Sequence, residues 1–106
     1  MLNCMFFIYI LHSEKSDLFY VGYTSNINLR LSQHNEQDTF STYTRKHRPW
    51  LLCALFQCGE DEGEAIKLER FIKKQHSRNF IEKLVDPHFV PTGQLAKLVR
   101  VPHVRD

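Results

Sequence analysis

Five side chains in this 106-residue chain are of the types that handle phosphate and water. Arg30 carries a planar guanidinium with several donors, which suits it to holding a phosphate and balancing its charge. His34 follows four residues later, where a helix would place it beside Arg30, able to relay a proton or bind phosphate. Glu69 is a hard oxygen donor of the kind that Mg²⁺ prefers, and Tyr9 and Tyr20 supply hydroxyls for hydrogen bonding. Each one alone is more often a surface or packing residue, so the elements that carry them matter.

Two short apolar runs would carry the tyrosines. Residues 6–11 and 18–23 are rich in aromatic and β-branched side chains and are too short for typical helices. The polar residues 12–17 between them provide a turn, so the pattern predicts an antiparallel hairpin. In such a hairpin Tyr9 and Tyr20 can reach the same face of the sheet.

A helix would carry Arg30 and His34. Residues 24–26 offer N-cap side chains, and Ile27, Leu31 and His34 then recur at helical spacing. This pattern predicts a first helix that ends at about residue 35. The polar residues that follow show no sustained period, which predicts an exposed loop over 36–48.

The rest of the chain predicts one more strand and two more helices. Residues 50–56 are apolar and too few for a helix, which indicates a third strand beside the hairpin. An acidic start after Gly59 and a basic end near residue 75 suit the polarity of a helix, and this helix would carry Glu69. A short third helix should end before Pro87. Residues 86–106 hold three of the four prolines and predict an extended or partly ordered tail.

Composition sets the broad class. Hydrophobic residues make up 42% and charged residues 25% of the chain, which is typical of one compact domain. A formal charge of +2 is too small a bias to identify a nucleic-acid-binding protein. Three cysteines do not indicate a disulfide framework, so a reducing cytoplasm is expected. No apolar run approaches the roughly 20 residues that cross a bilayer, so no membrane partner is expected.

Two triplets, Phe7-Ile8-Tyr9 and Tyr20-Val21-Gly22, resemble the paired signature of the GIY-YIG nuclease domain. The resemblance continues in order through Gly22-Tyr23-Thr24-Ser25-Asn26, Arg30-Leu31, Gln33-His34-Asn35, Tyr43-Thr44-Arg45-Lys46, Arg48-Pro49-Trp50, Leu68-Glu69 and Ile72-Lys73-Lys74. In order and spacing the set is similar to small stand-alone GIY-YIG proteins of bacteria. Two departures stand out: Phe7 replaces the glycine of the first triplet, and the asparagine found late in many members has no convincing counterpart.

The resemblance implies both a fold and an activity. The implied fold is α+β, a small and mainly antiparallel three-stranded sheet flanked by helices, with residues 1–85 as the nuclease-like domain and 86–106 as the tail. The implied activity is that of a metal-dependent endonuclease that uses Mg²⁺ or Mn²⁺ and hydrolyses nucleic-acid phosphodiester bonds. DNA is the expected partner ahead of RNA.

The resemblance also implies roles for particular residues. Tyr9 would be the general base or would position the water, although a phenol needs activation to act as a base. Tyr20, Arg30 and His34 would act around the scissile phosphate, and Glu69 would be the metal ligand. The implied contacts to nucleic acid are Gly22, Tyr43, Arg45, Lys46, Lys73 and Lys74. If the pattern of basic side chains is considered without the resemblance, its alternative interpretation is an ordinary helix face exposed to solvent.

Other functions are compatible with the same residues. The altered first triplet and the missing asparagine leave open a catalytically weak nucleic-acid-binding module on the same fold. A structural interaction protein that uses the tail is a third hypothesis. A zinc site formed by Cys53, Cys58 and histidines is disfavoured, because structural zinc sites commonly show two tight ligand pairs and the chain offers no second pair.

Overall fold

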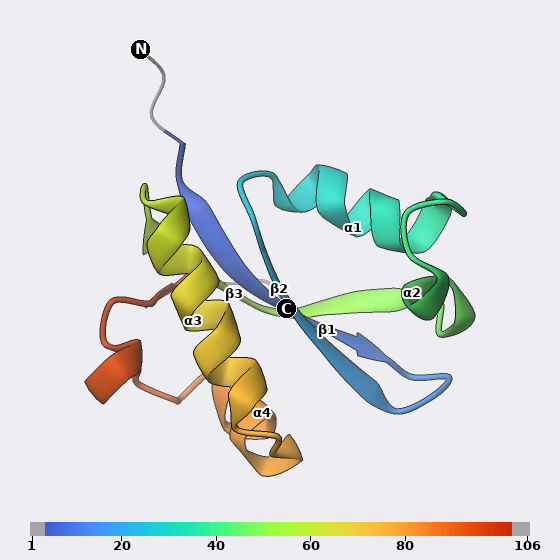
Figure 1. Ribbon diagram of the computed structural model, residues 1–106. Coiled ribbons are helices and arrows are strands. Elements are labelled where there is room, and N and C mark those ends of the chain that lie inside the picture. The colour runs from blue at the N-terminus through green and yellow to red at the C-terminus, as the bar shows by residue number, and fades with distance from the viewer. Residues whose placement is uncertain (1–3, 103–106) are drawn as a thin grey trace.

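A computed structural model describes residues 4–102 of the chain, and residues 1–3 and 103–106, the outer ends of the predicted domain and tail, lie outside the described part. The molecule has an α+β fold built on an antiparallel sheet with the strand order β2-β1-β3-β4 (Figure 1). Within residues 4–102 the sheet has four strands, where the sequence predicted three. Its strands are β1 (Phe6–Ser13), β2 (Leu18–Thr24), β3 (Trp50–Gly59) and β4 (Val99–Arg100).

The helices follow the predicted pattern with one addition. The four α-helices are α1 (Ile27–Glu36), α2 (Thr42–Lys46), α3 (Glu62–Lys74) and α4 (Arg78–Val85). Each begins after a side chain that accepts a backbone N–H bond, as Asn26 does for α1 and Asp61 for α3. The predicted loop over 36–48 was wrong in part, because it contains α2, a five-residue helix capped by Ser41. One turn and a half is too short to show a hydrophobic period.

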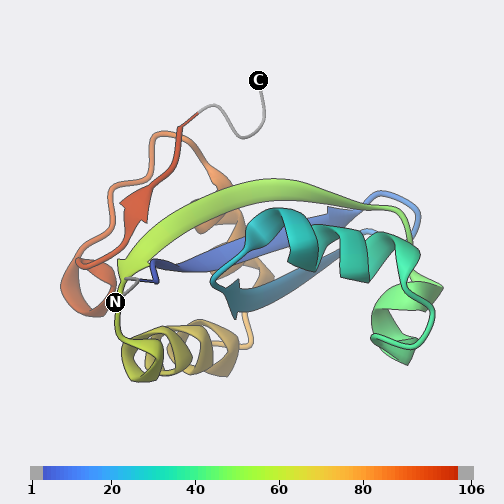
Figure 2. The same ribbon diagram turned by 90° about the horizontal axis from the view of Figure 1, so that it is seen from above.

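The sheet has two faces, and β1 shows how they differ. Ile8 and Ile10 point to one face, where they pack in a cluster with residues of α3, α4 and the C-terminal segment. Tyr9 and Leu11 alternate with them and point to the other face, towards α1. In Figure 2, α2 lies at one end of β3, and α3 and the C-terminal segment lie at the other. We call the two sides the aliphatic face and the α1 face.

The C-terminal segment, residues 86–102, closes the aliphatic face. Leu95 and Leu98 are buried in that cluster, and β4 pairs with the outer edge of β3. The Arg100 guanidinium lies 4.7 Å from the centre of the Phe56 ring and donates to the carbonyls of Leu84 and Asp86. A strand of two residues is invisible to a periodicity argument, which is why the fourth strand escaped the sequence prediction.

Side-chain bonds fix the end of α1 against the start of β3. The Asn35 amide accepts the backbone N–H of Trp50 at 2.7 Å and donates to its carbonyl at 3.0 Å. The Arg48 guanidinium donates to the carbonyls of His34 at 2.6 Å and Gln37 at 2.7 Å. The last turn of α1, which carries His34, is therefore held in place from outside the helix.

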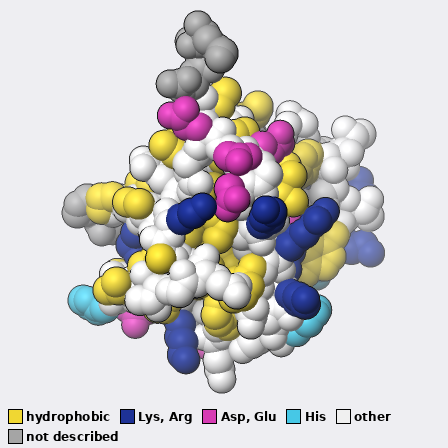
Figure 3. All heavy atoms as spheres, turned by 60° about the vertical axis from the view of Figure 1, so that its left-hand side comes forward, with side chains coloured by type: hydrophobic (Ala, Val, Ile, Leu, Met, Phe, Trp, Pro, Cys, Tyr) yellow, Lys and Arg dark blue, Asp and Glu magenta, His cyan; other side chains and the backbone are white. Residues whose placement is uncertain are grey.

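Charge is distributed unevenly along α3. The helix begins with the acidic residues Glu62 and Glu64 and ends with Lys73 and Lys74. Figure 3, in which the α3 side of the molecule comes forward, shows acidic side chains towards the top and Lys and Arg side chains below them. Within residues 4–102 no helix combines the length and the apolar character that crossing a bilayer requires.

Candidate active site

A buried tyrosine–histidine pair forms the centre of the α1 face. The Tyr9 hydroxyl and His34 Nε2 lie 2.9 Å apart, although β1 and α1 are separated by a strand and a loop. Tyr9 is 1% exposed and His34 is fully buried. His34 Nδ1 is also buried and has no hydrogen-bond partner among the described residues. A native fold rarely leaves a buried polar atom unpaired, so this nitrogen is a feature of functional interest.

Gly22 sets the position of the Tyr9 ring. The pairing of β1 with β2 puts Tyr9 directly opposite Gly22. A Cβ at Gly22 would overlap the Tyr9 hydroxyl and ring, with 2.9 Å to Cε1. The phenol therefore lies against the one residue of β2 that has no side chain. The glycine thus leaves room for Tyr9, and a contact of Gly22 with nucleic acid stays a prediction.

Tyr20 extends the pair into an aromatic cluster. Its ring centre lies 4.8 Å from that of His34 and 6.3 Å from that of Tyr9, and the two phenol rings are inclined by only 26°. Trp50 packs edge-on against Tyr20 at 6.1 Å. The two tyrosines thus share the α1 face, and Tyr20 is the more exposed of them.

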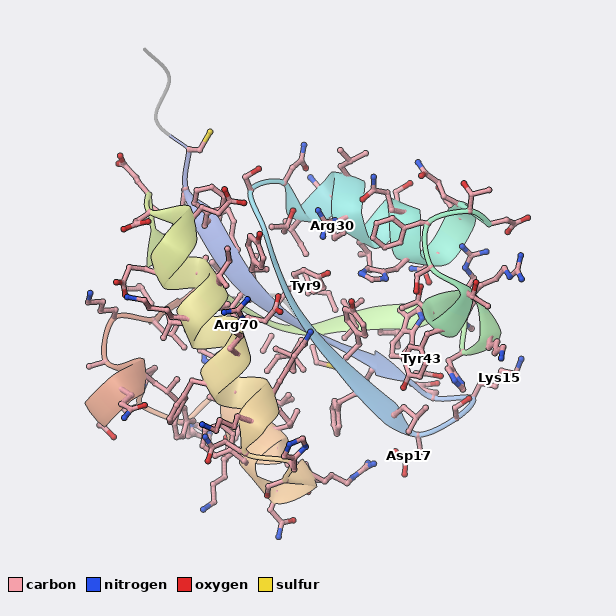
Figure 4. All side chains as sticks on the ribbon, viewed as in Figure 1. Tyr9, Lys15, Asp17, Arg30, Tyr43 and Arg70 are labelled. Atoms are coloured by element: carbon pink, nitrogen blue, oxygen red, sulfur yellow. The ribbon has the colours of Figure 1, made fainter. Side chains whose placement is uncertain are left out.

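Arg30 brings positive charge to this cluster. It lies one turn before His34 on α1, and its guanidinium is 5.5 Å from the centre of the Phe40 ring. Figure 4 shows Arg30 and Tyr9 on the α1 side of the strands. Phe40, which also packs edge-on against His34 at 4.9 Å, is a site residue that the sequence reasoning missed. The only signal for it was a phenylalanine in the otherwise polar segment 36–48, where Tyr43 is the other aromatic ring of Phe or Tyr type.

The protonation states of the central pair follow from burial. Burial raises the pKa of the Tyr9 phenol well above its ordinary value, Tyr20 and Glu69 act in the same direction, and the Arg30 charge opposes them. Burial lowers the pKa of His34 to about 4, and the charges of Arg30 and Arg48 contribute to this decrease. At neutral pH the pair is a neutral phenol beside a neutral imidazole.

Glu69 reaches the site from α3. Its side chain is 19% exposed, and its Oε1 lies 3.2 Å from Lys73 Nζ. The negative charge of Glu69 acts on both Tyr9 and Tyr23, which places the carboxylate near the cluster. Lys73 Nζ in turn lies 5.4 Å from the centre of the Tyr20 ring. The two helices flank opposite faces of the sheet, and near Tyr9 α1 supplies the charge of Arg30 and α3 supplies the charge of Glu69.

The donor chemistry of Glu69 fits a hard divalent cation. Among residues 4–102 only one oxygen of this carboxylate is paired, with Lys73. One protein carboxylate, completed by substrate phosphate and waters, is an ordinary way to hold Mg²⁺. The described residues contain no group of three or more His, Cys, Asp or Glu side chains that could hold a metal ion by themselves. Cys53 and Cys58 are buried, and burial raises the pKa of the Cys58 thiol to about 11.

The predicted nucleic-acid contacts are only partly gathered at the site. Gly22 lies against Tyr9, and Lys73 contacts Glu69 and the Tyr20 ring. Tyr43 lies at the rim, 48% exposed and with its ring 6.5 Å from that of Tyr20. Arg45 and Lys46 are exposed on α2, at the opposite end of β3 from α3 (Figure 2). Lys74 is exposed on α3 beside Lys73. Arg48, a neighbour of Arg45 in the same basic run, is turned inward to hold the end of α1.

Comparison with known proteins identifies the family of the chain. The family model described as the GIY-YIG catalytic domain matches residues 5–83, and the chain belongs to the GIY-YIG nuclease family. A curated relative is the UPF0213 protein DP2720 of the bacterium Desulfotalea psychrophila, which is 38% identical to this chain over 68 residues. The match covers 64% of this chain and 60% of the length of that protein.

Proposed function

We propose that the chain is a metal-dependent endonuclease that hydrolyses phosphodiester bonds of DNA. The observation that carries the proposal is the convergence of Arg30 and Glu69, of opposite charge and from different helices, on the Tyr9–His34 pair. Hydrolysis of a phosphodiester requires a positioned water and compensation of the charge that develops on the phosphoryl oxygens. The site offers a group for each requirement.

Compensation of the phosphate charge is assigned to Arg30 and to the divalent ion that Glu69 would hold. The Arg30 guanidinium can donate two parallel hydrogen bonds to phosphate oxygens. Glu69 would hold the divalent ion, Mg²⁺ or Mn²⁺, which when bound neutralises phosphate charge and makes water more acidic. Lys73, which contacts both Glu69 and the Tyr20 ring, adds a second positive charge at the same edge.

The Tyr9–His34 pair is assigned to positioning the water. Of the two roles that the family resemblance implies for Tyr9, positioning suits the observed surroundings better than proton abstraction. A phenol with a raised pKa is a poor acid, and a histidine with a pKa of about 4 is a poor acceptor for its proton. His34 therefore holds the phenol in place by a hydrogen bond, and Tyr20 bonds to the water or the phosphate.

The proposed contacts to nucleic acid begin at the site and extend beyond it. Gly22, Tyr43, Arg45, Lys46, Lys73 and Lys74 are proposed to contact nucleic acid, the lysines and Arg45 through phosphates. The exposed basic side chains on the α3 side of the molecule support this assignment (Figure 3). The thiols of Cys4 and Cys58, which form no disulfide among residues 4–102, support a reducing compartment such as the cytoplasm as the place of action.

The decisive experiment is cleavage by a Glu69→Gln variant. Wild type, Glu69→Gln and Glu64→Gln are compared on single-stranded, duplex and branched DNA and on RNA, with and without Mg²⁺ or Mn²⁺. Glu64 is a matched control because it lies on the same helix and also pairs with lysines. We expect metal-stimulated cleavage by wild type and Glu64→Gln, and none by Glu69→Gln with an unchanged fold. Full turnover by Glu69→Gln would exclude Glu69 as the essential ligand.

A second candidate function is a nucleic-acid-binding module with little turnover. The observation that favours it is the burial of Tyr9, whose side chain has almost no exposed surface from which to reach a water. The same assay decides between the two functions. Binding of the wild type to nucleic acid without metal-stimulated cleavage of any tested substrate would replace the enzyme with the binding module.

A further inference from the structure

A groove of about 350 Å³ lies beside the candidate active site. It follows β2 and is bounded on its other side by the junction of α3 and α4. Phe19 and Ile81 contribute to its apolar floor, and its rim carries Tyr20, Lys73, His76 and Arg78. Its volume is at the lower end of the range for ligand-binding sites, so it has room for about one nucleoside and none for a duplex.

The groove is continuous with the candidate active site. Tyr20 packs against His34 on the site side and also lines the groove. Lys73 contacts Glu69 at 3.2 Å and lines the groove as well. A polynucleotide whose scissile phosphate lies between Arg30 and Glu69 therefore has a neighbouring nucleotide at the mouth of the groove.

The charge and the flat surfaces of the groove suit a nucleotide. No Asp or Glu is among the described residues that line it, whereas Lys73 and Arg78 are cationic. The Arg78 guanidinium lies 5.0 Å from the centre of the Phe19 ring and is held there by Asp17 at 2.7 Å. Aromatic rings and guanidinium planes are the surfaces on which unstacked bases pack.

The strand that forms one wall can also bond to a base. β2 is an edge strand, because β1 is the only strand of the described part of the chain that pairs with it. Residues 18–21, which line the groove, therefore present backbone N–H and C=O groups on their outer side that the sheet does not use. Such groups can bond to the edge of a base that has no complementary partner.

We propose that this groove binds one unpaired nucleotide next to the scissile phosphate. The proposal rests on the proposed nuclease function and narrows its substrate class to nucleic acid that is single-stranded or locally unpaired at the cleavage position. A fully paired duplex cannot place a base in the groove unless the base leaves its stack and loses its pairing partner, which is unfavourable.

The first test is a scan with abasic nucleotides. The Glu69→Gln protein, which should bind without cutting, is titrated into labelled single-stranded oligonucleotides in which the abasic position moves along the chain, and anisotropy reports affinity. We expect one or two adjacent positions to weaken binding by about 5- to 150-fold, the usual effect of one lost base-stacking contact, while the other positions have little effect. A flat scan with intact binding would overturn the proposal.

The second test changes the groove itself. Ile81→Trp should fill the groove and remove the positional effect, whereas Val85→Trp, one turn further along α4 and outside the groove, should retain it. Arg78→Ala should weaken binding more than Lys83→Ala, although each variant loses one positive charge from the same helix. Circular dichroism and thermal unfolding confirm that each protein is folded. The proposal would be contradicted if the two tryptophan variants kept the same positional effect and the two alanine variants bound with the same affinity.

The outcomes separate the groove from the nuclease. Cleavage by the wild type together with a flat scan overturns the groove alone and leaves β2 as a free edge for other partners such as a peptide strand. A peaked scan without any metal-stimulated cleavage supports the groove and overturns the nuclease. Absence of binding to every nucleic acid overturns both.

Discussion

The two faces of one sheet differ in chemistry although the same strands form them. On the aliphatic face, β1 places Ile8 and Ile10 in a cluster of apolar side chains from α3, α4 and the C-terminal segment. On the α1 face, the residue between them is Tyr9, bonded to the buried His34. The two faces are only a strand's thickness apart, so backbone geometry does not cause the difference.

The comparison indicates a division of labour between stability and function. Burial of apolar surface on the aliphatic face is favourable and does not depend on the direction of the contacts. Burial of Tyr9 and His34 requires hydrogen bonds, and the structure leaves His34 Nδ1 without one among the described residues. A fold keeps such an arrangement where its residues have a task, which is why we place the chemistry on the α1 face.

The largest expected effect is on stability and comes from the aliphatic face. Ile10→Ala should lower the free energy of unfolding by about 2 to 5 kcal/mol, because it removes buried methyl groups and leaves a cavity. Urea unfolding measures the loss. Single-turnover cleavage should stay at the wild-type rate at temperatures where the variant is folded. A reduced rate in the folded variant would mean that the two faces are not separable.

The next effect concerns pH and the α1 face. His34 has a pKa of about 4 in the fold against an ordinary value of 6.5, so as the pH falls the unfolded chain takes up its proton first. The stability that neutral His34 contributes is therefore present above pH 6.5 and is lost between pH 6.5 and 4, by about 3 kcal/mol. Urea titrations at several pH values measure it, and His34→Gln should remove this part of the slope. The same slope in both proteins would contradict a buried neutral histidine.

Arg30→Ala should act on the rate and leave the fold intact. If the guanidinium meets charge that develops on the phosphoryl group, the single-turnover rate at saturating substrate should fall by on the order of 10². Arg30→Lys should recover only part of the loss, because an ammonium cannot make the two parallel bonds of a guanidinium. Weaker binding with an unchanged saturated rate would reduce Arg30 to a residue that positions substrate.

The smallest effect distinguishes two neighbouring lysines. Lys73→Ala and Lys74→Ala should each make the plot of log affinity against log salt shallower by about 0.7 to 0.9, if each lysine contacts one phosphate. Lys73 also contacts Glu69 and the Tyr20 ring, whereas Lys74 is simply exposed. Lys73→Ala should therefore lower the saturated rate as well, and Lys74→Ala should not. An unchanged saturated rate in both variants would place both lysines outside the chemistry.

Much of the fold could be predicted because its main elements are long and periodic. The hairpin of β1 and β2, the strand β3 and the helices α1, α3 and α4 all carry local signals of pattern or capping. The elements that escaped, α2 and β4, have five and two residues and depend on tertiary contacts. The sequence thus supported the antiparallel α+β class and the family, and it underestimated the number of strands.

The candidate site was less predictable than the fold. Resemblance to a family selected Tyr9, Arg30, His34 and Glu69, but no local pattern shows that Tyr9 and His34 are hydrogen-bonded across 25 positions. Nor does the charge of Arg48 reveal that its guanidinium faces the end of α1 and not the solvent. Such contacts depend on how strands and helices meet in space. The catalytic roles themselves stay predictions until the variants are measured.

The close packing of Tyr9 against Gly22, which leaves no room for a Cβ, has a consequence for genetics. Every missense change in the codon for Gly22 adds a Cβ, and each one therefore displaces the Tyr9 ring. Revertants selected for a folded protein should carry a smaller side chain in place of Tyr9, and they would lack the hydroxyl that His34 holds. Revertants selected for cleavage should restore glycine itself. A screen at this one codon would thus show whether the cell requires only the folded protein or also its cleavage activity.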